Sequence, residues 1–290
     1  MTAEQSTTTN GLGKRARPGG RKVRPLAAVL GVVWFLIAFY PVYYMFTTSL
    51  RTQAGFLEGS LWIPPANPTL ENYLSVINSG IGLYFVNSLF VTVFTVVLIV
   101  FVSFLAAYAI ARIRSRFVQI VFNIFLLGLA IPLQAAVIPI YVLVTRMGLY
   151  DTLFGLIPPQ VAFGIPLTVL ILVNFIRDIP NELYDSMVLD GGGHVRLLRS
   201  LVFPLSRPAL ITVVIYNALQ VWNNFLFPLI LTQSQNVSTL PLALQQFQGQ
   251  YGVNVPGLMA AVFLSVLPII LLYVVARRQL LGGLTAGFGK

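Results

Sequence analysis

Residues able to carry out catalysis are scarce in this 290-residue chain, and that scarcity limits its function. The chain has one histidine, His194, and no cysteine, which excludes disulfides and the structural zinc sites built on cysteines or paired histidines. A lone histidine leaves no Ser/His/Asp triad. The three lysines, Lys14, Lys22 and Lys290, stand outside any G-x-x-x-x-G-K-[ST] loop. We therefore expect no catalytic residue, no metal and no cofactor, so an ATP-driven activity would require hydrolysis by a partner.

Residues 177–207 form a polar stretch whose residue types and spacing suggest a binding function. An amphipathic helix is predicted because apolar side chains recur at near-helical spacing, at Leu183, Met187 and Leu189. Asn181 is its predicted N-cap, and Gly191–Gly193 end it. A second short basic helix is predicted from His194 to Val202, before Pro204. The apolar stripe fits either a groove on a partner protein or the membrane surface, and the spacing does not choose between them.

The elements that must hold this stretch are apolar. A soluble domain carries roughly 25% charged residues, whereas this chain has 9% charged and 57% hydrophobic residues. A helix needs roughly 20 apolar residues to cross the bilayer hydrocarbon. Segments of that kind, without a charged residue or histidine, occur six times, at about residues 26–50, 85–111, 117–145, 152–176, 208–231 and 258–276. The sequence therefore predicts an all-α membrane protein with six transmembrane helices.

The positions of the basic residues predict the orientation. If the N-terminus is cytoplasmic, 16 of the 18 Lys and Arg residues fall in cytoplasmic segments, and only Arg51 and Arg146 lie outside. That asymmetry is the one required by the positive-inside rule. We therefore expect a multi-pass protein of the bacterial cytoplasmic membrane with both termini in the cytoplasm. The net charge of +10 is explained in this way without a nucleic-acid partner.

Charge at membrane depth separates classes of transporter. Ion- and proton-coupled carriers usually hold an intramembrane carboxylate, histidine or lysine, and the six apolar segments contain none. No internal repeat of the kind that builds many secondary transporters is visible. A sodium-coupled carrier that uses carbonyls and hydroxyls remains an alternative, as does a membrane scaffold without transport activity.

The loop at residues 177–207 resembles the cytoplasmic loop of ABC importer permeases, which carries E-A-A, three residues, G, nine residues and I-x-L-P. Asp185-Ser186-Met187 stand at E-A-A, Gly191 at G, Leu201 at I, and Phe203-Pro204 at L-P, with every spacing kept. The resemblance implies a coupling helix that docks on a separate ATPase. The residues that it assigns to this coupling are Glu182, Asp185, Ser186, Met187, Asp190, Gly191 and Pro204.

Further stretches resemble the carbohydrate-type permeases, in particular the second membrane subunit of maltose-type importers. They lie at residues 65–73, 131–141, 222–225, 239–242 and 283–287. The resemblance implies a type I ABC importer permease organised as a basic tail (1–24), a first helix with its external loop (25–80), a permease core (81–280) and a C-terminal tail (281–290). It also implies a second homologous permease, an ATPase dimer, an extracytoplasmic solute-binding protein, surrounding lipid, and a sugar or oligosaccharide as substrate. A polyamine, phosphonate or other solute remains the alternative.

A sugar is neutral and rich in hydroxyls, so amide side chains suit it better than charges do. Amides within or near the apolar segments are expected to face protein or water. They are Gln134, Asn174, Asn217, Gln220, Asn223 and Asn224. Two interpretations remain open for each, contact with the substrate or a hydrogen bond between helices worth about 0.6 kcal/mol.

Overall fold

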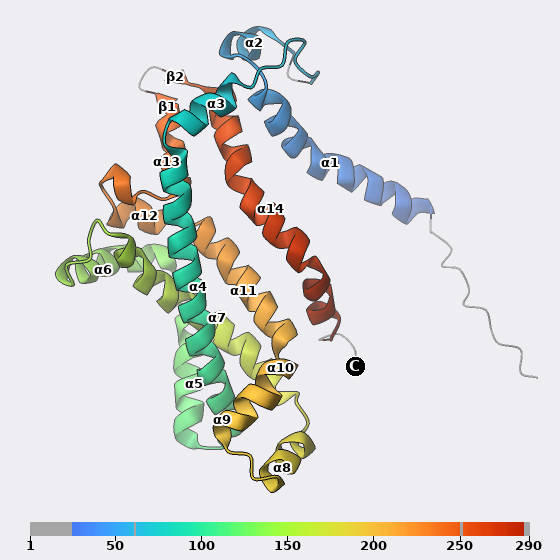
Figure 1. Ribbon diagram of the computed structural model, residues 1–290, viewed down its shortest axis with the longest axis vertical. Helices are drawn as coiled ribbons and strands as arrows, with labels where there is room; N and C mark the ends of the chain where they lie inside the picture. The colour runs from blue at the N-terminus through green and yellow to red at the C-terminus, as the bar shows by residue number, and fades with distance from the viewer. Residues whose placement is uncertain (1–24, 61, 250–251, 287–290) are drawn as a thin grey trace, which may run out of the picture. The chain divides into compact units, whose positions relative to one another are not determined.

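The computed structural model describes residues 25–60, 62–249 and 252–286, most of which are helical (Figure 1). The elements in chain order are α1 (Pro25–Ser49), α2 (Gln53–Glu58), α3 (Glu71–Asn78), α4 (Ile81–Arg112), α5 (Arg116–Gly128), α6 (Leu133–Arg146), α7 (Leu153–Arg177), α8 (Asn181–Leu189), α9 (His194–Leu197), η1 (Leu198–Val202), α10 (Phe203–Leu205), α11 (Arg207–Trp222), α12 (Leu226–Leu231), η2 (Gln235–Val237), α13 (Leu240–Ala243), η3 (Leu244–Phe247), β1 (Gln248–Gly249), β2 (Gly252–Val253) and α14 (Val255–Ala286). The predicted tail at residues 1–24 and the chain end at 287–290 lie outside the described residues.

The chain divides into two compact units, Met1–Tyr44 and Met45–Lys290. The described part of the first unit is the start of α1, whose side chains are apolar all round and exposed, with Trp34 71% exposed. The rings of Phe35 and Phe39 stack at 5.5 Å along it. A helix that is apolar on every side is typical of a membrane span rather than of a soluble surface.

Four of the predicted segments are continuous helices long and apolar enough to cross a membrane, as predicted. They are α1, α4, α7 and the first part of α14, Val255–Val274. Many of their large apolar side chains are exposed, for example Val97 at 60% and Phe101 at 61% on α4. The number of spans rises to six if each of two bent helix pairs counts as one.

The predicted segment at 117–145 is one of those bent pairs and not one helix. α5 and α6 meet at 103°. Pro132 stands directly before α6 with an extended backbone, at φ −69° and ψ 128°. Proline lacks an N–H and its ring disfavours helical geometry in the residue before it, so the helix that ends at Gly128 cannot continue through Ile131.

The predicted segment at 208–231 is also broken, at Asn223–Phe225 between α11 and α12. The break is caused by Pro228, because in a continuous helix its ring would clash with the carbonyl of the residue four positions earlier. At the third position of a new helix the missing N–H costs nothing, so α12 begins at Leu226. A second bend, of 74°, separates α9–α10 from α11.

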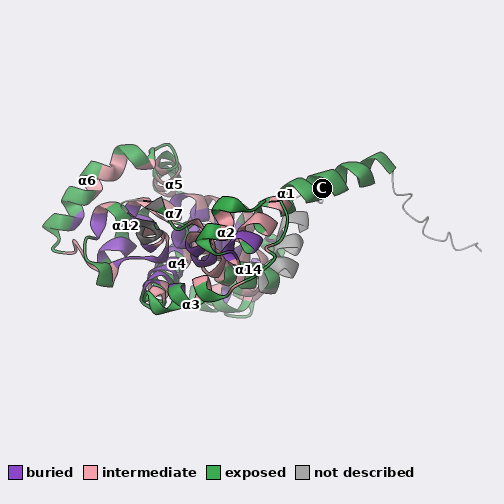
Figure 2. Ribbon diagram, turned by 90° about the horizontal axis from the view of Figure 1, so that it is seen from above, coloured by how far each residue is buried: buried purple, intermediate pink, exposed green. Residues whose placement is uncertain are grey.

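The core of the second unit lies where α4 and α7 pack together along their length, with α11 beside them. Buried residues gather there in Figure 2, while the outer sides of the helices are exposed. The buried cluster there contains four side chains of α7 without accessible surface: Val169, Leu172, Val173 and Ile176. The same cluster includes Tyr184 of α8 and Leu197 of α9, so the loop at 177–207 is packed on the helices that it joins.

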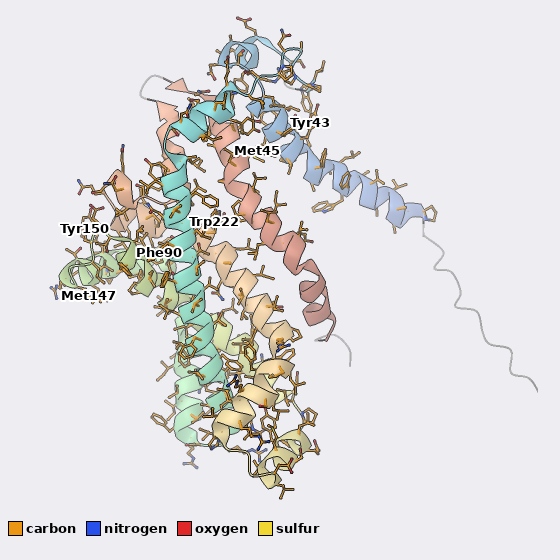
Figure 3. The ribbon with its side chains drawn as sticks, in the orientation of Figure 1. Tyr43, Met45, Phe90, Met147, Tyr150 and Trp222 are labelled. Atoms are coloured by element: carbon orange, nitrogen blue, oxygen red, sulfur yellow. The ribbon has the colours of Figure 1, made fainter. Side chains whose placement is uncertain are left out.

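The segment after α12 is tied back to neighbouring helices by polar contacts. The Asn87 amide of α4 donates to the carbonyls of Asn236 and Ser238, at 2.8 and 2.9 Å. Asp151, at φ 58°, accepts from the backbone N–H groups of Gln233 and Ser234. Hydrogen bonds from Ser234 and Gln233 lower the pKa of the Asp151 carboxyl. Figure 3 shows Tyr150 and Met147 beside this turn, and Tyr150 packs edge-on against Tyr141.

Candidate coupling loop and substrate pathway

At the start of α8, a side chain binds to another helix, and no side chain caps the backbone of α8 itself. Pro180 is the N-cap, with φ −55° and ψ 138°, and no side chain caps the first turn. Asn181 is the first helical residue, so its predicted role as N-cap was wrong. Its Oδ1 instead accepts a hydrogen bond of 2.8 Å from Nη1 of Arg112, the last residue of α4.

Arg112 also stacks on α8. Its Cζ lies 3.6 Å from the centre of the Tyr184 ring, the geometry of a cation–π contact. Tyr184 is only 2% exposed, and burial raises the pKa of its phenol, opposed by the nearby Arg112 charge. One arginine therefore fixes both the first turn and the buried face of α8 to the end of α4.

The end of α8 is a Schellman motif. Gly191 has φ 75°, and its N–H donates to the Val188 carbonyl at 3.0 Å, while the Gly192 N–H donates to the Met187 carbonyl at 2.9 Å. The glycines therefore end the helix, as predicted, and Gly191 does so in a left-handed conformation. A Cβ at Gly192 would lie 2.7 Å from the Met187 carbonyl oxygen, so two successive positions require glycine.

The exposed side of the loop differs from the predicted stripe. Tyr184 is its buried residue, and Met187 is half-buried against the same core. The apolar residues exposed on α8 and α9 are Leu183 at 40%, which belongs to the predicted stripe, Val188 at 56%, Leu189 at 87% and Val195 at 80%. This nine-residue helix therefore has two apolar sides. One side packs on the core of its own chain, and the other is exposed. The predicted coupling residues Glu182, Asp185, Ser186, Asp190 and Gly191 are all exposed as well.

The predicted helix from His194 to Val202 is α9 followed by a π-helical turn, η1. The Phe203 N–H donates to the carbonyl of Leu198, five residues earlier. Pro204, half-buried in α10, cannot donate and follows directly on this turn. His194 Nδ1 lies 3.3 Å from the hydroxyl of Tyr108 on α4, a second tie between the loop and that helix.

A cavity of about 250 Å³ joins some of the predicted amides. Asn217, Gln220 and Asn224 line it, whereas Gln134, Asn174 and Asn223 do not and are exposed. The other polar groups of its wall are the Tyr216 phenol and Gln160 of α7. Gln160 was not predicted from the sequence. The available signal was its position, because it is an amide within the predicted span at 152–176 and lies close in sequence to the three prolines of that span.

The three predicted amides of the cavity make different hydrogen bonds. Asn217 Nδ2 donates to Thr168 Oγ1 at 2.9 Å and to the Val213 carbonyl at 2.7 Å, so this buried amide joins α11 to α7. Gln220 Nε2 donates to the Tyr216 hydroxyl at 2.9 Å. Asn224 Oδ1 accepts from the Phe227 N–H, in the first turn of α12, at 3.0 Å. Asn217 thus has the helix-joining role. Among the described residues Gln220 bonds only to Tyr216 on its own helix, so its side chain is the freer of the two to contact a substrate.

The described residues contain no group of three or more His, Asp or Glu able to hold a metal ion. The arrangement is instead that of a multi-pass membrane protein with a loop that projects at one end of α4 and α7 (Figure 1). An amide-lined cavity lies among α4, α7 and α11.

The chain belongs to the family of binding-protein-dependent transport system inner membrane components, whose profile matches residues 99–281. It is 40% identical, over 89% of its length and 94% of the relative's, to a Caldicellulosiruptor sp. (strain Rt8B.4) chain provisionally named ABC transporter permease protein ORF2. It is 30% identical to the melibiose/raffinose/stachyose import permease protein MelC of Bacillus subtilis, over 93% of this chain and 96% of MelC.

Solved structures support the fold. A chain from a bacterial ABC transporter involved in the import of the acidic polysaccharide alginate superposes with a TM-score of 0.77. The two chains are 21% identical, and the match covers 92% of this chain and 99% of the other. The predicted class, an ABC importer permease fold with all-α architecture, is confirmed.

Proposed function

We propose that the chain is a permease subunit of an ATP-driven importer, and that it forms half of the translocation pathway for a sugar or oligosaccharide. The observation that carries the ATP-driven part is the loop at 177–207. It keeps the spacing of the coupling motif, is fixed to α4 by Arg112, and exposes Leu189 and three carboxylates at its tip. The sugar part is supported by relatives such as MelC, named for melibiose, raffinose and stachyose.

The chain needs partners for this role. It has no phosphate-binding loop of its own, so an ATPase dimer supplies hydrolysis and receives α8 in an apolar cleft. A second homologous permease completes the pathway, and lipid covers the remaining exposed apolar side chains of α4 and α14. An extracytoplasmic solute-binding protein delivers the sugar to the external side, where α2, α3 and the β1–β2 hairpin lie in this proposal.

Transport then follows from a rigid-body change. ATP binding closes the ATPases, and α8 passes the movement to α4 through Arg112 and Tyr184. The pathway alternates between inward-open and outward-open states, which is a two-state equilibrium shifted by a ligand on a partner. Both termini and the loop at 177–207 are cytoplasmic in this proposal, as the basic residues predict.

The test is uptake by proteoliposomes that hold the complete importer. Labelled glucose, melibiose or raffinose should enter only with ATP and the solute-binding protein. A proton or sodium gradient should not replace ATP, since no Asp, Glu, His, Lys or Arg lies within the apolar segments. The same chain reconstituted alone should move none of them. Gradient-driven uptake by the lone chain would establish the carrier alternative, and ATP-driven uptake of a different solute class would remove the sugar assignment.

A further inference from the structure

An apolar groove lies between α4 and the bend that joins α9–α10 to α11. Its first hollow has a volume of about 570 Å³ and is lined from α4, α9, η1, α10 and α11. A second hollow of about 360 Å³ shares Val96, Val97 and Val214 with it and continues between α4, α11 and α14. Along α4 the two extend from Leu105 to Leu89, which is about 24 Å of helix. The groove is therefore long enough for an acyl chain of one leaflet, which is half of roughly 30 Å of hydrocarbon.

One end of this groove is basic. Arg199 of η1 is the one charged residue among the described residues that line the first hollow, and all the others there are apolar. Arg207 lies beside the same hollow, with its Cζ 5.8 Å from the centre of the ring of Phe203, a wall residue. Both arginines are exposed, and neither forms an ion pair with a carboxylate of the described residues. An apolar groove with two unpaired guanidinium groups at one end has the charge pattern that suits an anionic amphiphile.

The helix that carries Arg199 is oriented like a surface helix. α9–α10 meets α11 at 74°, so with α11 as a span this helix runs close to the plane of the membrane. Its apolar side chains Val195, Leu198 and Phe203 line the groove, and Val195 is 80% exposed. Helices that combine such apolar side chains with basic ones bind the membrane interface through buried apolar area and through attraction to anionic lipids. The bend thus brings the level of the lipid headgroups to the end of the groove where Arg199 lies.

A transmembrane helix fits the groove less well than a lipid does. A helix of the second permease would cover the apolar side chains but would bring no anion to the arginines. The first span of this chain follows the basic residues Arg21, Lys22 and Arg24, whose charges would repel Arg199 and Arg207. A phospholipid supplies both a hydrocarbon chain and a phosphate, the anion that guanidinium groups bind through paired hydrogen bonds.

We propose that this groove binds one anionic phospholipid of the cytoplasmic leaflet, with an acyl chain along α4 and the phosphate on Arg199 and Arg207. The inference goes beyond the proposed function, because neither the sugar nor ATP enters it. It shares with that function only the cytoplasmic orientation of the loop at 177–207.

The experiment uses the complete importer in phosphatidylcholine nanodiscs that contain a trace of a photoactivatable lipid with a diazirine in one acyl chain. The probe has either the anionic phosphatidylglycerol headgroup or the phosphatidylcholine headgroup, which has no net charge. Peptide mapping after irradiation should find about 25-fold more phosphatidylglycerol than phosphatidylcholine adducts on residues 96–105 and 195–214, since each arginine contributes about fivefold. Arg199→Gln should reduce this ratio to about fivefold, and Arg199→Gln with Arg207→Gln to about one. Arg199→Lys keeps the charge and should keep most of the ratio.

Arg196→Gln is the matched control for charge. Arg196 is exposed one turn before Arg199 and does not line the groove, so its removal should leave the wild-type ratio unchanged. An equal fall in Arg196→Gln and Arg199→Gln would assign the preference to the general surface charge and would overturn the inference.

A second pair of variants tests the groove itself. Val97→Trp fills the junction of the two hollows and should abolish the excess of phosphatidylglycerol adducts. Val86→Trp should not, because Val86 lies on the same helix at nearly the same exposure, 59% against 60%, but outside the groove. Equal labelling by the two probes would overturn the inference, as would the absence of adducts because a partner helix covers the groove. ATP-driven uptake is measured separately, so a failed lipid site leaves the proposed function intact.

Discussion

The three consecutive glycines after α8 differ in how strongly the backbone requires them. Gly191 adopts φ 75°, where a Cβ is costly in any surroundings. Gly192 has an ordinary φ, but a Cβ would press on the Met187 carbonyl at 2.7 Å. Gly193 has φ −78° and open space around it, so nothing in the chain requires a glycine there. The family's glycine position, Gly191, is thus the one that the backbone demands most.

Gly191→Val should weaken docking of the ATPase and abolish uptake, while insertion into the membrane remains. A left-handed conformation costs roughly 1–2 kcal/mol for a residue with a Cβ and more for a β-branched one, so the Schellman motif should open and misdirect α9. Co-purification of the ATPase and substrate-stimulated hydrolysis measure this. Gly193→Val is the matched control and should behave as the wild type. Equal behaviour of the two variants would show that α8 is not the coupling element.

The amides show what sequence can and cannot predict at this scale. Their residue type marks Asn217, Gln220 and Asn224 as candidates, and these do share a cavity. Gln134 and Asn223 have the same residue types but are exposed and lie outside it. Which amides converge depends on the rotation of α7 and α11 about their axes and on two chain breaks. Neither quantity is encoded in local hydropathy, and Gln160 was overlooked for the same reason.

At the scale of elements, hydropathy predicted the continuous spans and failed at the broken ones. α1, α4, α7 and α14 lie where the apolar segments are, because length and composition decide them. A hydropathy average does not register the difference between Pro166, which α7 accommodates, and Pro132, at which a helix stops. Surrounding helices decide whether a proline bends or breaks a span, so the break is a tertiary effect.

Arg112 is the element-scale link between α4 and α8, and its removal should loosen the loop. Arg112→Leu loses a hydrogen bond from a charged donor and a cation–π contact, together worth about 2 kcal/mol, or roughly a thirtyfold rise in the detached population of α8. Hydrogen exchange of residues 181–189 in the assembled complex should accelerate by about that factor, and substrate-stimulated ATP hydrolysis should fall.

The neighbouring Arg114→Leu removes the same charge from an exposed side chain that makes no such contact, so it serves as the control. Its exchange rates at residues 181–189 should match the wild type. Equal acceleration in both variants would mean that net charge, and not the contact of Arg112 with Asn181 and Tyr184, holds α8 in place.

At the scale of the molecule, the second unit has two chemically different ends. One end carries the basic residues Arg112, Arg114, Arg177, Arg196 and Arg199, around α8 and the adjoining helix ends (Figure 1). The other holds α2, α3 and the hairpin of β1 and β2, which pairs Gln248 with Val253. Positive charge at one end of a multi-pass protein is the signal that orients it toward the cytoplasm.

Single cysteines should report this orientation directly, because the natural chain contains none and needs no background removed. Gln235→Cys places a thiol at an exposed position of η2 whose side chain makes no hydrogen bond to the described residues, and it should react in intact cells with a membrane-impermeant maleimide. Ser200→Cys, exposed in η1 beside the coupling helix, should react only after the membrane is permeabilised. Ser234 and Ser115 lie in the same two regions but are less suitable, because their hydroxyls bind Asp151 and cap α5. Labelling of Ser200→Cys from outside, with protection of Gln235→Cys, would reverse the orientation and would place α8 where no ATPase can reach it.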